Sequence, residues 1–137
     1  MRIMGLDYGS VRIGVAVSDP SCIIAQPKDY ISAVPRKQCL AKIAELCKEG
    51  QISQIVIGLP RHMNGDEGVS AKAAREFGTA ITEFMDIDVD FLDERLTTVS
   101  ANNVLTERNM KAPEKKEKID SIAAAIILQN YLDMKSI

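Results

Sequence analysis

Apolar and small or polar residues alternate along the first third of the chain with the two-residue period of β-strands. Arg2–Leu6 and Arg12–Ser18 show this pattern on either side of a turn at 8–10. A third, weaker extended segment is expected at Asp29–Ser32. Because short turns join antiparallel neighbours, the three segments predict an antiparallel meander.

The middle of the chain alternates between helical and strand patterns. Apolar residues recur at helical spacing between Pro35 and Gly50, which predicts a helix there. Ile52–Leu59 contains an almost continuous apolar run, which is typical of an interior strand covered on both faces. A helix around Ser70–Met85 and a short strand at Val89–Leu92 are expected to follow.

The last third of the chain predicts two helices. Thr98–Arg108 has helical spacing with Thr98 as a possible N-cap, and the final helix is expected to open at Pro113. The complete order is β-β-β-α-β-α-β-α-α. A meander followed by alternating strands and helices predicts an α/β fold in which helices cover a mixed sheet.

Length and composition indicate one globular domain over residues 1–137. The chain is 46% hydrophobic and 26% charged, and no apolar run approaches the ~20 residues that cross a bilayer. The apolar opening is interrupted by Asp7, too early for a signal peptide. The three cysteines show no paired spacing. We therefore expect a cytoplasmic protein whose reduced thiols pack as small hydrophobic groups.

The charge is unevenly distributed along the chain. The net charge of −2 argues against a protein that holds nucleic acid by a bulk positive field. However, 111–118 contains four lysines and two glutamates, so a basic segment interrupts an otherwise acidic chain. Nucleic acid therefore stays among the candidate partners.

Three acidic positions lie on separate predicted elements. Asp7 ends the first strand, the acidic pair Asp93-Glu94 follows the last strand, and Asp120 lies near the start of the final helix. Each has an ordinary structural explanation, because aspartate is common in turns and carboxylates favour helix N-termini. Together they form a group that the fold could bring to one point. Clustered carboxylates repel one another unless protons or cations intervene, and Mg²⁺ prefers oxygen ligands.

Such a carboxylate cluster indicates hydrolysis of phosphodiesters. Two metal ions about 3.5–4 Å apart can activate water and stabilise the leaving oxygen without a protein nucleophile. The sequence shows no Ser/His/Asp or Cys/His pattern, and His62 is its only histidine. A metal-dependent nuclease site is therefore the hypothesis that these residues favour.

Cationic residues flank the acidic positions. Arg12, Arg61 and Arg95 could bind phosphates in a bidentate manner, although each could equally form a surface ion pair. Lys115 and Lys116 lie in the basic segment just before Asp120. We expect these five residues to contact the nucleic acid backbone.

Several segments in the same order resemble the YqgF (RuvX) family over essentially the whole chain. The segments are Gly5–Ser10, Arg12–Asp19, Gly58–Pro60, Asp93–Thr98, and Lys115–Lys116 with Asp120. Proteins of this family are described as pre-16S rRNA nucleases and as Holliday-junction-resolvase-like, with a ribonuclease H-like fold. The resemblance implies a triad of Asp7, Glu94 and Asp120 that holds one or two Mg²⁺ or Mn²⁺ ions.

The sequence departs from the family pattern at two places. The loop that often ends in Met-Asp-Gly reads Met-Asn-Gly at 63–65, which removes one carboxylate. In related resolvases an acidic residue ends the strand that corresponds to Ile55–Leu59, but Gly58-Leu59-Pro60 contains none. Glu94 from the next strand would therefore have to complete the metal site.

Two other functions remain open at this point, and a third is set aside because of the length of the chain. The first is cleavage of branched DNA, as in Holliday junction resolvases, in place of pre-16S rRNA in a ribosomal particle. The second is a non-catalytic ribosome-associated or nucleic-acid-binding factor that keeps the three carboxylates as structural ligands. The third is a sugar-kinase-like or actin-like ATPase, suggested by the turn Asp7-Tyr8-Gly9. Those ATPases clamp the nucleotide between two such domains, whereas 137 residues provide one.

Overall fold

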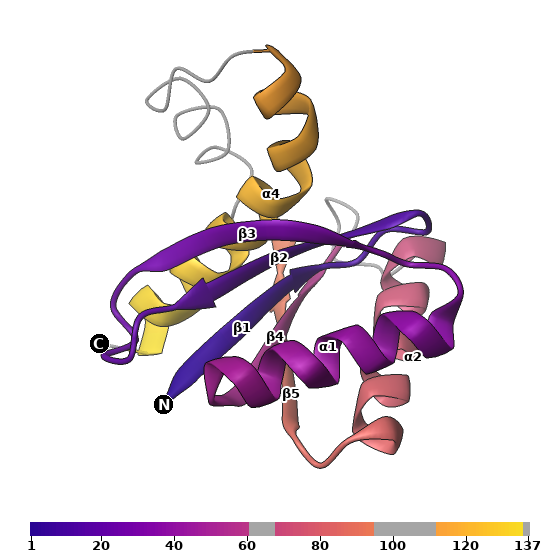
Figure 1. The fold of residues 1–137 in the computed structure, drawn as a ribbon, viewed down its shortest axis with the longest axis horizontal. Helices are drawn as coiled ribbons and strands as arrows, with labels where there is room; N and C mark the ends of the chain where they lie inside the picture. Colours follow the sequence, from indigo (N-terminus) through magenta and orange to yellow (C-terminus); the bar gives the residue numbers. More distant parts are fainter. Residues whose placement is uncertain (61–67, 95–111, 136–137) are drawn as a thin grey trace.

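The computed structural model describes residues 1–60, 68–94 and 112–135, and only the backbone of 112–120 (Figure 1). Five strands form one sheet in the order β3-β2-β1-β4-β5. Their bounds are Arg2–Asp7 for β1, Arg12–Ser18 for β2, Ala25–Ser32 for β3, Ile52–Leu59 for β4 and Asp88–Asp93 for β5. Neighbours among β1, β2 and β3 are antiparallel, whereas β4 and β5 continue the sheet parallel to β1. The predicted mixed sheet is confirmed.

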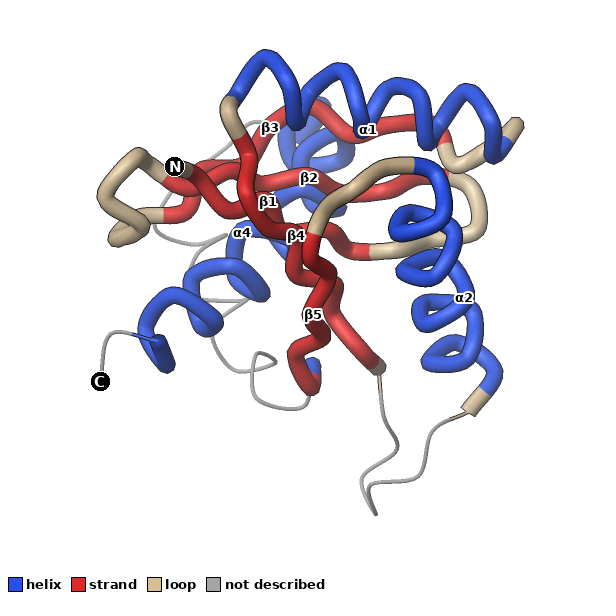
Figure 2. Tube along the Cα trace, turned by 90° about the horizontal axis from the view of Figure 1, so that it is seen from below, coloured by secondary structure: helices blue, strands red, loops and turns tan. Residues whose placement is uncertain are grey.

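Helices cover both faces of this sheet (Figures 1 and 2). The described helices are α1 (Arg36–Gly50), α2 (Val69–Phe84) and α4 (Ala112–Lys135). Helices α1 and α2 pack on one face in a core that includes Ile43 and Phe77. Helix α4 packs on the other face through residues such as Ile127 and Leu128. The helix predicted at Thr98–Arg108 lies outside the described residues.

Alternation along β1 sends its side chains to the two cores in turn. Met4 and Leu6 belong to the core under α1 and α2, so Gly5 and Asp7 face α4. A Cβ atom at Gly5 would lie 2.7 Å from Leu128 Cβ and 3.0 Å from the carbonyl oxygen of Ala124. Glycine is therefore required here so that α4 can approach the sheet.

The third strand is longer than its sequence pattern predicts. The expected strand was Asp29–Ser32, but β3 begins at Ala25. Its first half lies at the sheet edge, where Gln26 and Lys28 are exposed and dilute the apolar pattern. A side chain from a distant element holds this half in place, because Ala25 N–H donates to Gln129 Oε1 at 2.9 Å. The sequence pattern contains no sign of that contact.

The cysteines pack as expected for small hydrophobic groups. All three are free; Cys39 and Cys47 are buried in the core under α1, and Cys22 is half-buried. Burial raises the pKa of Cys47 to about 11. Among the described residues, no helix combines the length and hydrophobicity needed to span a bilayer.

Tyr131 joins α4 to the two parallel strands through its hydroxyl group. Gln54 Nε2 donates to Tyr131 Oη at 2.7 Å, and Tyr131 Oη donates to Asp90 Oδ2 at 2.9 Å. We expect Tyr131→Phe to lower the free energy of unfolding by about 1–2 kcal/mol, because Gln54 and Asp90 lose their shared partner. Urea denaturation checks this. The control Tyr30→Phe, at a residue that is 41% exposed, should stay within about 0.5 kcal/mol of the parent protein.

Candidate active site

Asp7 ends β1 on the face of the sheet that α4 covers. It pairs with Gly14 of β2, and the chain turns sharply immediately after it. A Cβ atom at Gly9 would collide with the carbonyl oxygen of Arg12, so this tight turn depends on glycine. Asp7 is therefore held at the carboxyl end of the central strand, between the apolar strand before it and the glycine-dependent turn after it.

Glu94 reaches Asp7 across the strand that separates them. It directly follows β5, and β4 lies between β5 and β1. A Cβ atom at Gly58 of β4 would lie 2.8 Å from Glu94 Oε1 and 2.9 Å from Glu94 Cγ. The missing side chain at Gly58 therefore leaves the space through which Glu94 extends toward Asp7. The side chains of Glu94 and Asp7 are hydrogen-bonded.

The electrostatics of this pair favour a cation. The pKa of Glu94 is raised, mainly by burial and also by the charge of Asp93. The hydrogen bond with Asp7 acts in the opposite direction and lowers it. Two carboxyl groups can form a hydrogen bond only if they share a proton, because two carboxylates are both acceptors. A divalent cation can replace that proton and offset the repulsion.

The described carboxylates fit a hard divalent ion. Mg²⁺ is usually held by one or two carboxylates together with water and substrate phosphates, which matches the Asp7–Glu94 pair. Within the described side chains, no group of three His, Cys, Asp or Glu residues is placed to hold a metal. The side chain of Asp120, the third predicted ligand, lies outside the described set.

The backbone of α4 passes beside this pair. Val15 N–H donates to Ser121 Oγ at 3.3 Å, and both groups are buried. Val15 follows Gly14, the pairing partner of Asp7. This bond therefore anchors α4, one residue after Asp120, near the end of β1 and on the same face as Asp7.

The predicted cationic residues are only partly described. Arg12 begins β2, and its guanidinium carbon lies 5.3 Å from the centre of the Tyr30 ring. Arg61 and Arg95 lie outside the described residues. Lys115 and Lys116 belong to the first turns of α4, which extend beyond the sheet (Figure 1).

A cationic and aromatic cluster absent from the sequence-based predictions forms around Tyr8, the residue after Asp7, on the face that α1 and α2 cover. Arg36 Nη2 donates to Tyr8 Oη at 3.2 Å, and its guanidinium carbon lies 5.6 Å from the centre of the Phe77 ring. The rings of Tyr8 and Phe77 are 4.8 Å apart. The three residues come from a turn and two helices, so no local pattern could have indicated that they meet.

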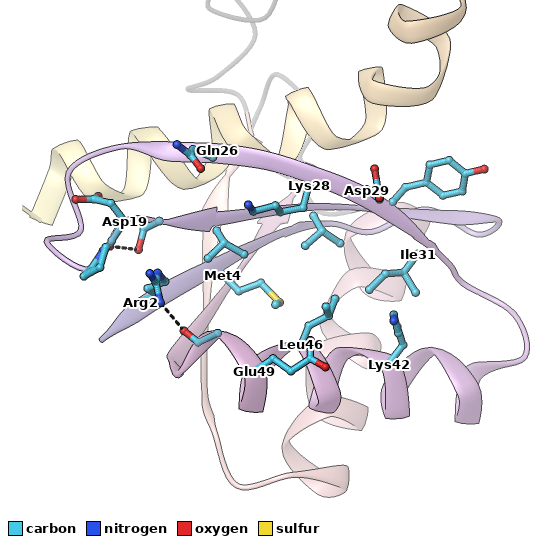
Figure 3. A pocket seen from close by; sticks show the side chains of 16 residues that line it. Arg2, Met4, Asp19, Gln26, Lys28, Asp29, Ile31, Lys42, Leu46 and Glu49 are labelled. Atoms are coloured by element: carbon cyan, nitrogen blue, oxygen red, sulfur yellow. Dashed lines mark hydrogen bonds between the residues drawn. The ribbon is translucent and has the colours of Figure 1, made fainter.

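A large open hollow lies away from the Asp7–Glu94 pair, on the face that α1 covers (Figure 3). Its volume is about 680 Å³, and Met4, Ile31 and Leu46 contribute to its apolar floor. Asp7 and Glu94 do not line it. The volume of a hollow therefore does not indicate where the Asp7–Glu94 pair lies.

The sheet order, with α4 opposite α1 and α2, is that of a ribonuclease H-like α/β fold. A solved structure of Thermus thermophilus RuvC with a Holliday junction substrate matches with a TM-score of 0.62 and 14% identity, covering 99% of this chain and 97% of that chain. The fowlpox virus Holliday junction resolvase matches with a TM-score of 0.59 and 12% identity, covering 98% and 99%. At these identities the similarity concerns the fold.

The chain belongs to the RuvX family. The model of that family, described as "Holliday junction resolvase", matches residues 1–134. A Syntrophomonas wolfei relative is 48% identical over 133 residues, which cover 97% of this chain and 94% of the relative. A Roseiflexus relative is 43% identical over 132 residues, which cover 96% and 94%. Both are named "Putative pre-16S rRNA nuclease". The resemblance noted from the sequence motifs is confirmed.

Proposed function

We propose that this protein is a divalent-metal-dependent endonuclease that hydrolyses phosphodiester bonds in structured RNA. Its substrate would be pre-16S rRNA in a ribosomal particle, processed at the 5′ end in the cytoplasm, and residues 1–137 would form one nuclease domain. The names of the relatives support the substrate. The observation that carries the proposal is the Asp7–Glu94 pair, which Gly58 allows to form across β4.

In this proposal Asp7, Glu94 and Asp120 hold one or two Mg²⁺ or Mn²⁺ ions. A bound ion would polarise the phosphate and lower the pKa of attacking water. Asp7 ends one strand of a rigid sheet and Glu94 directly follows another, so their carboxyl groups are positioned before substrate binds. The same ions would reverse the local negative potential where a phosphate must bind.

The cationic residues would hold the substrate backbone. Arg12 lies on the α4 face with Asp7, and we assign phosphate contacts to Arg12, Arg61, Arg95, Lys115 and Lys116. Because the chain is acidic overall, binding without metal should be weak.

Branched DNA is the second candidate substrate. The family model carries the description "Holliday junction resolvase", and the T. thermophilus neighbour is titled as a complex with a Holliday junction. Both substrates would use the same carboxylates. Only a direct comparison of cleavage separates them.

Cleavage assays with labelled pre-16S rRNA and a labelled four-way DNA junction test the proposal, each with and without Mg²⁺ or Mn²⁺. We expect metal-dependent cleavage of the RNA and loss of product when EDTA removes the metal. Preferential cleavage of the junction would favour the DNA candidate. If neither substrate is cut while RNA still binds, the protein is a binding factor and the nuclease assignment is wrong.

A further inference from the structure

Strand β3 carries a β-bulge opposite the position of Asp7. Ile13 pairs with Ile31 and Val15 pairs with Lys28, so Gly14 of β2 faces two residues of β3, Asp29 and Tyr30. On its other side Gly14 pairs with Asp7. Bulges of this kind change the direction of a side chain and are over-represented beside active sites.

The bulge places Tyr30 on the same face of the sheet as Asp7. Ile13 and Ile31 belong to the core under α1, so alternation turns the side chains of Arg12 and Tyr30 toward the α4 side, while Tyr30 also lines the hollow on the α1 side. Adjacent strands are ~4.8 Å apart, so the backbone of Tyr30 lies roughly 10 Å from that of Asp7 across β2. That separation is within the reach of the nucleotides that flank a phosphate bound at Asp7.

The environment of Tyr30 suits a flat, unpaired base. Tyr30 is 41% exposed, and the Arg12 guanidinium carbon lies 5.3 Å from the centre of its ring. Aromatic rings and guanidinium planes are the two side-chain surfaces on which proteins stack single-stranded bases. Arg12 of β2 and Tyr30 of β3 therefore present both surfaces together, on the side of the sheet that carries Asp7.

We propose that Tyr30 and Arg12 form a stacking platform for an unpaired base of the substrate, adjacent to the phosphate bound at Asp7. The inference rests on the proposed nuclease function and adds a preference for nucleic acid that is single-stranded beside the cleaved bond. The stacked base orients the strand, while the carboxylates act on the phosphate. Tyr30 is a substrate-binding residue in this scheme and takes no part in proton transfer.

The test is RNA binding in an Asp7→Asn background, which prevents cleavage during the measurement. Single-stranded RNA oligonucleotides carry 2-aminopurine at successive positions, because stacking quenches its fluorescence. We expect quenching at one or two positions. Tyr30→Leu should abolish this quenching and weaken binding about 5- to 100-fold, whereas Tyr30→Phe keeps the ring and should bind within about twofold of the parent.

The matched control is Phe84→Leu, which removes the aromatic ring of another exposed residue, 45% exposed, at the end of α2. It should change neither quenching nor affinity, and thermal unfolding should show that both leucine variants are folded. If Tyr30→Leu binds and quenches like its parent while wild-type protein cleaves RNA, the platform is wrong and the nuclease function stands. If wild-type protein neither cleaves nor binds RNA, the proposed function and the platform fail together.

Discussion

Asp7→Asn should lower metal-dependent cleavage by at least about 100-fold, because a ligand to the ion contributes several kcal/mol to the transition state. The substitution is nearly isosteric. An asparagine amide can donate to Glu94 without a shared proton, so the repulsion within the pair disappears. The free energy of unfolding should therefore stay equal or rise. Single-turnover cleavage and urea denaturation of the same preparation measure the two effects.

The control for Asp7→Asn is Asp88→Asn, which removes an exposed carboxylate at the opposite end of β5 from Glu94. This variant should cleave at the wild-type rate. If Asp7→Asn lowers the free energy of unfolding as well as the cleavage rate, the result would indicate a structural role for Asp7. Wild-type cleavage by Asp7→Asn would remove Asp7 from the site altogether.

Most of the fold is predictable because each element carries its own local pattern. The apolar run in β4 and the alternation in β2 depend only on which faces are buried, and both strands have their predicted bounds. The first half of β3 could not be predicted, because its contact with Gln129 joins residues 104 positions apart. A local sequence pattern cannot indicate a contact between residues so far apart in the chain.

The site is predictable in part for a different reason. Asp7 and Glu94 follow strands that run parallel, and parallel strands bring their carboxyl ends to one edge of a sheet. The sequence could not show that β4 separates them or that Gly58 is the residue between. These two facts follow only from the pairing of Gly58 with Leu92 and from the face of the sheet on which each side chain lies. The Tyr30 bulge is hidden for the same reason.

Gly58→Ala should reduce cleavage by about 100-fold, since displacing a catalytic group by about 1 Å can cost that much. The new methyl group would occupy the space 2.8 Å from Glu94 Oε1 and would also contact Ile127 Cδ1. Ile127 Cδ1 and Glu94 Oε1 are the far ends of flexible side chains, but Glu94 Cγ at 2.9 Å is not, so the whole Glu94 side chain must shift, at a cost of about 1–2 kcal/mol. Glu94 must then move away from Asp7. Cleavage rates over a Mg²⁺ titration, together with thermal unfolding, measure the two consequences.

Gly50→Ala is the matched control, because the nearest described atom to its new Cβ atom would be Ile52 Cδ1 at 3.4 Å, an ordinary contact. This variant should keep both activity and stability. If Gly58→Ala is folded and as active as wild type, Glu94 does not act from across β4, and the two-strand carboxylate pair is not the catalytic centre. If its activity falls and higher Mg²⁺ restores part of it, the substitution has weakened a metal site, as the pair requires.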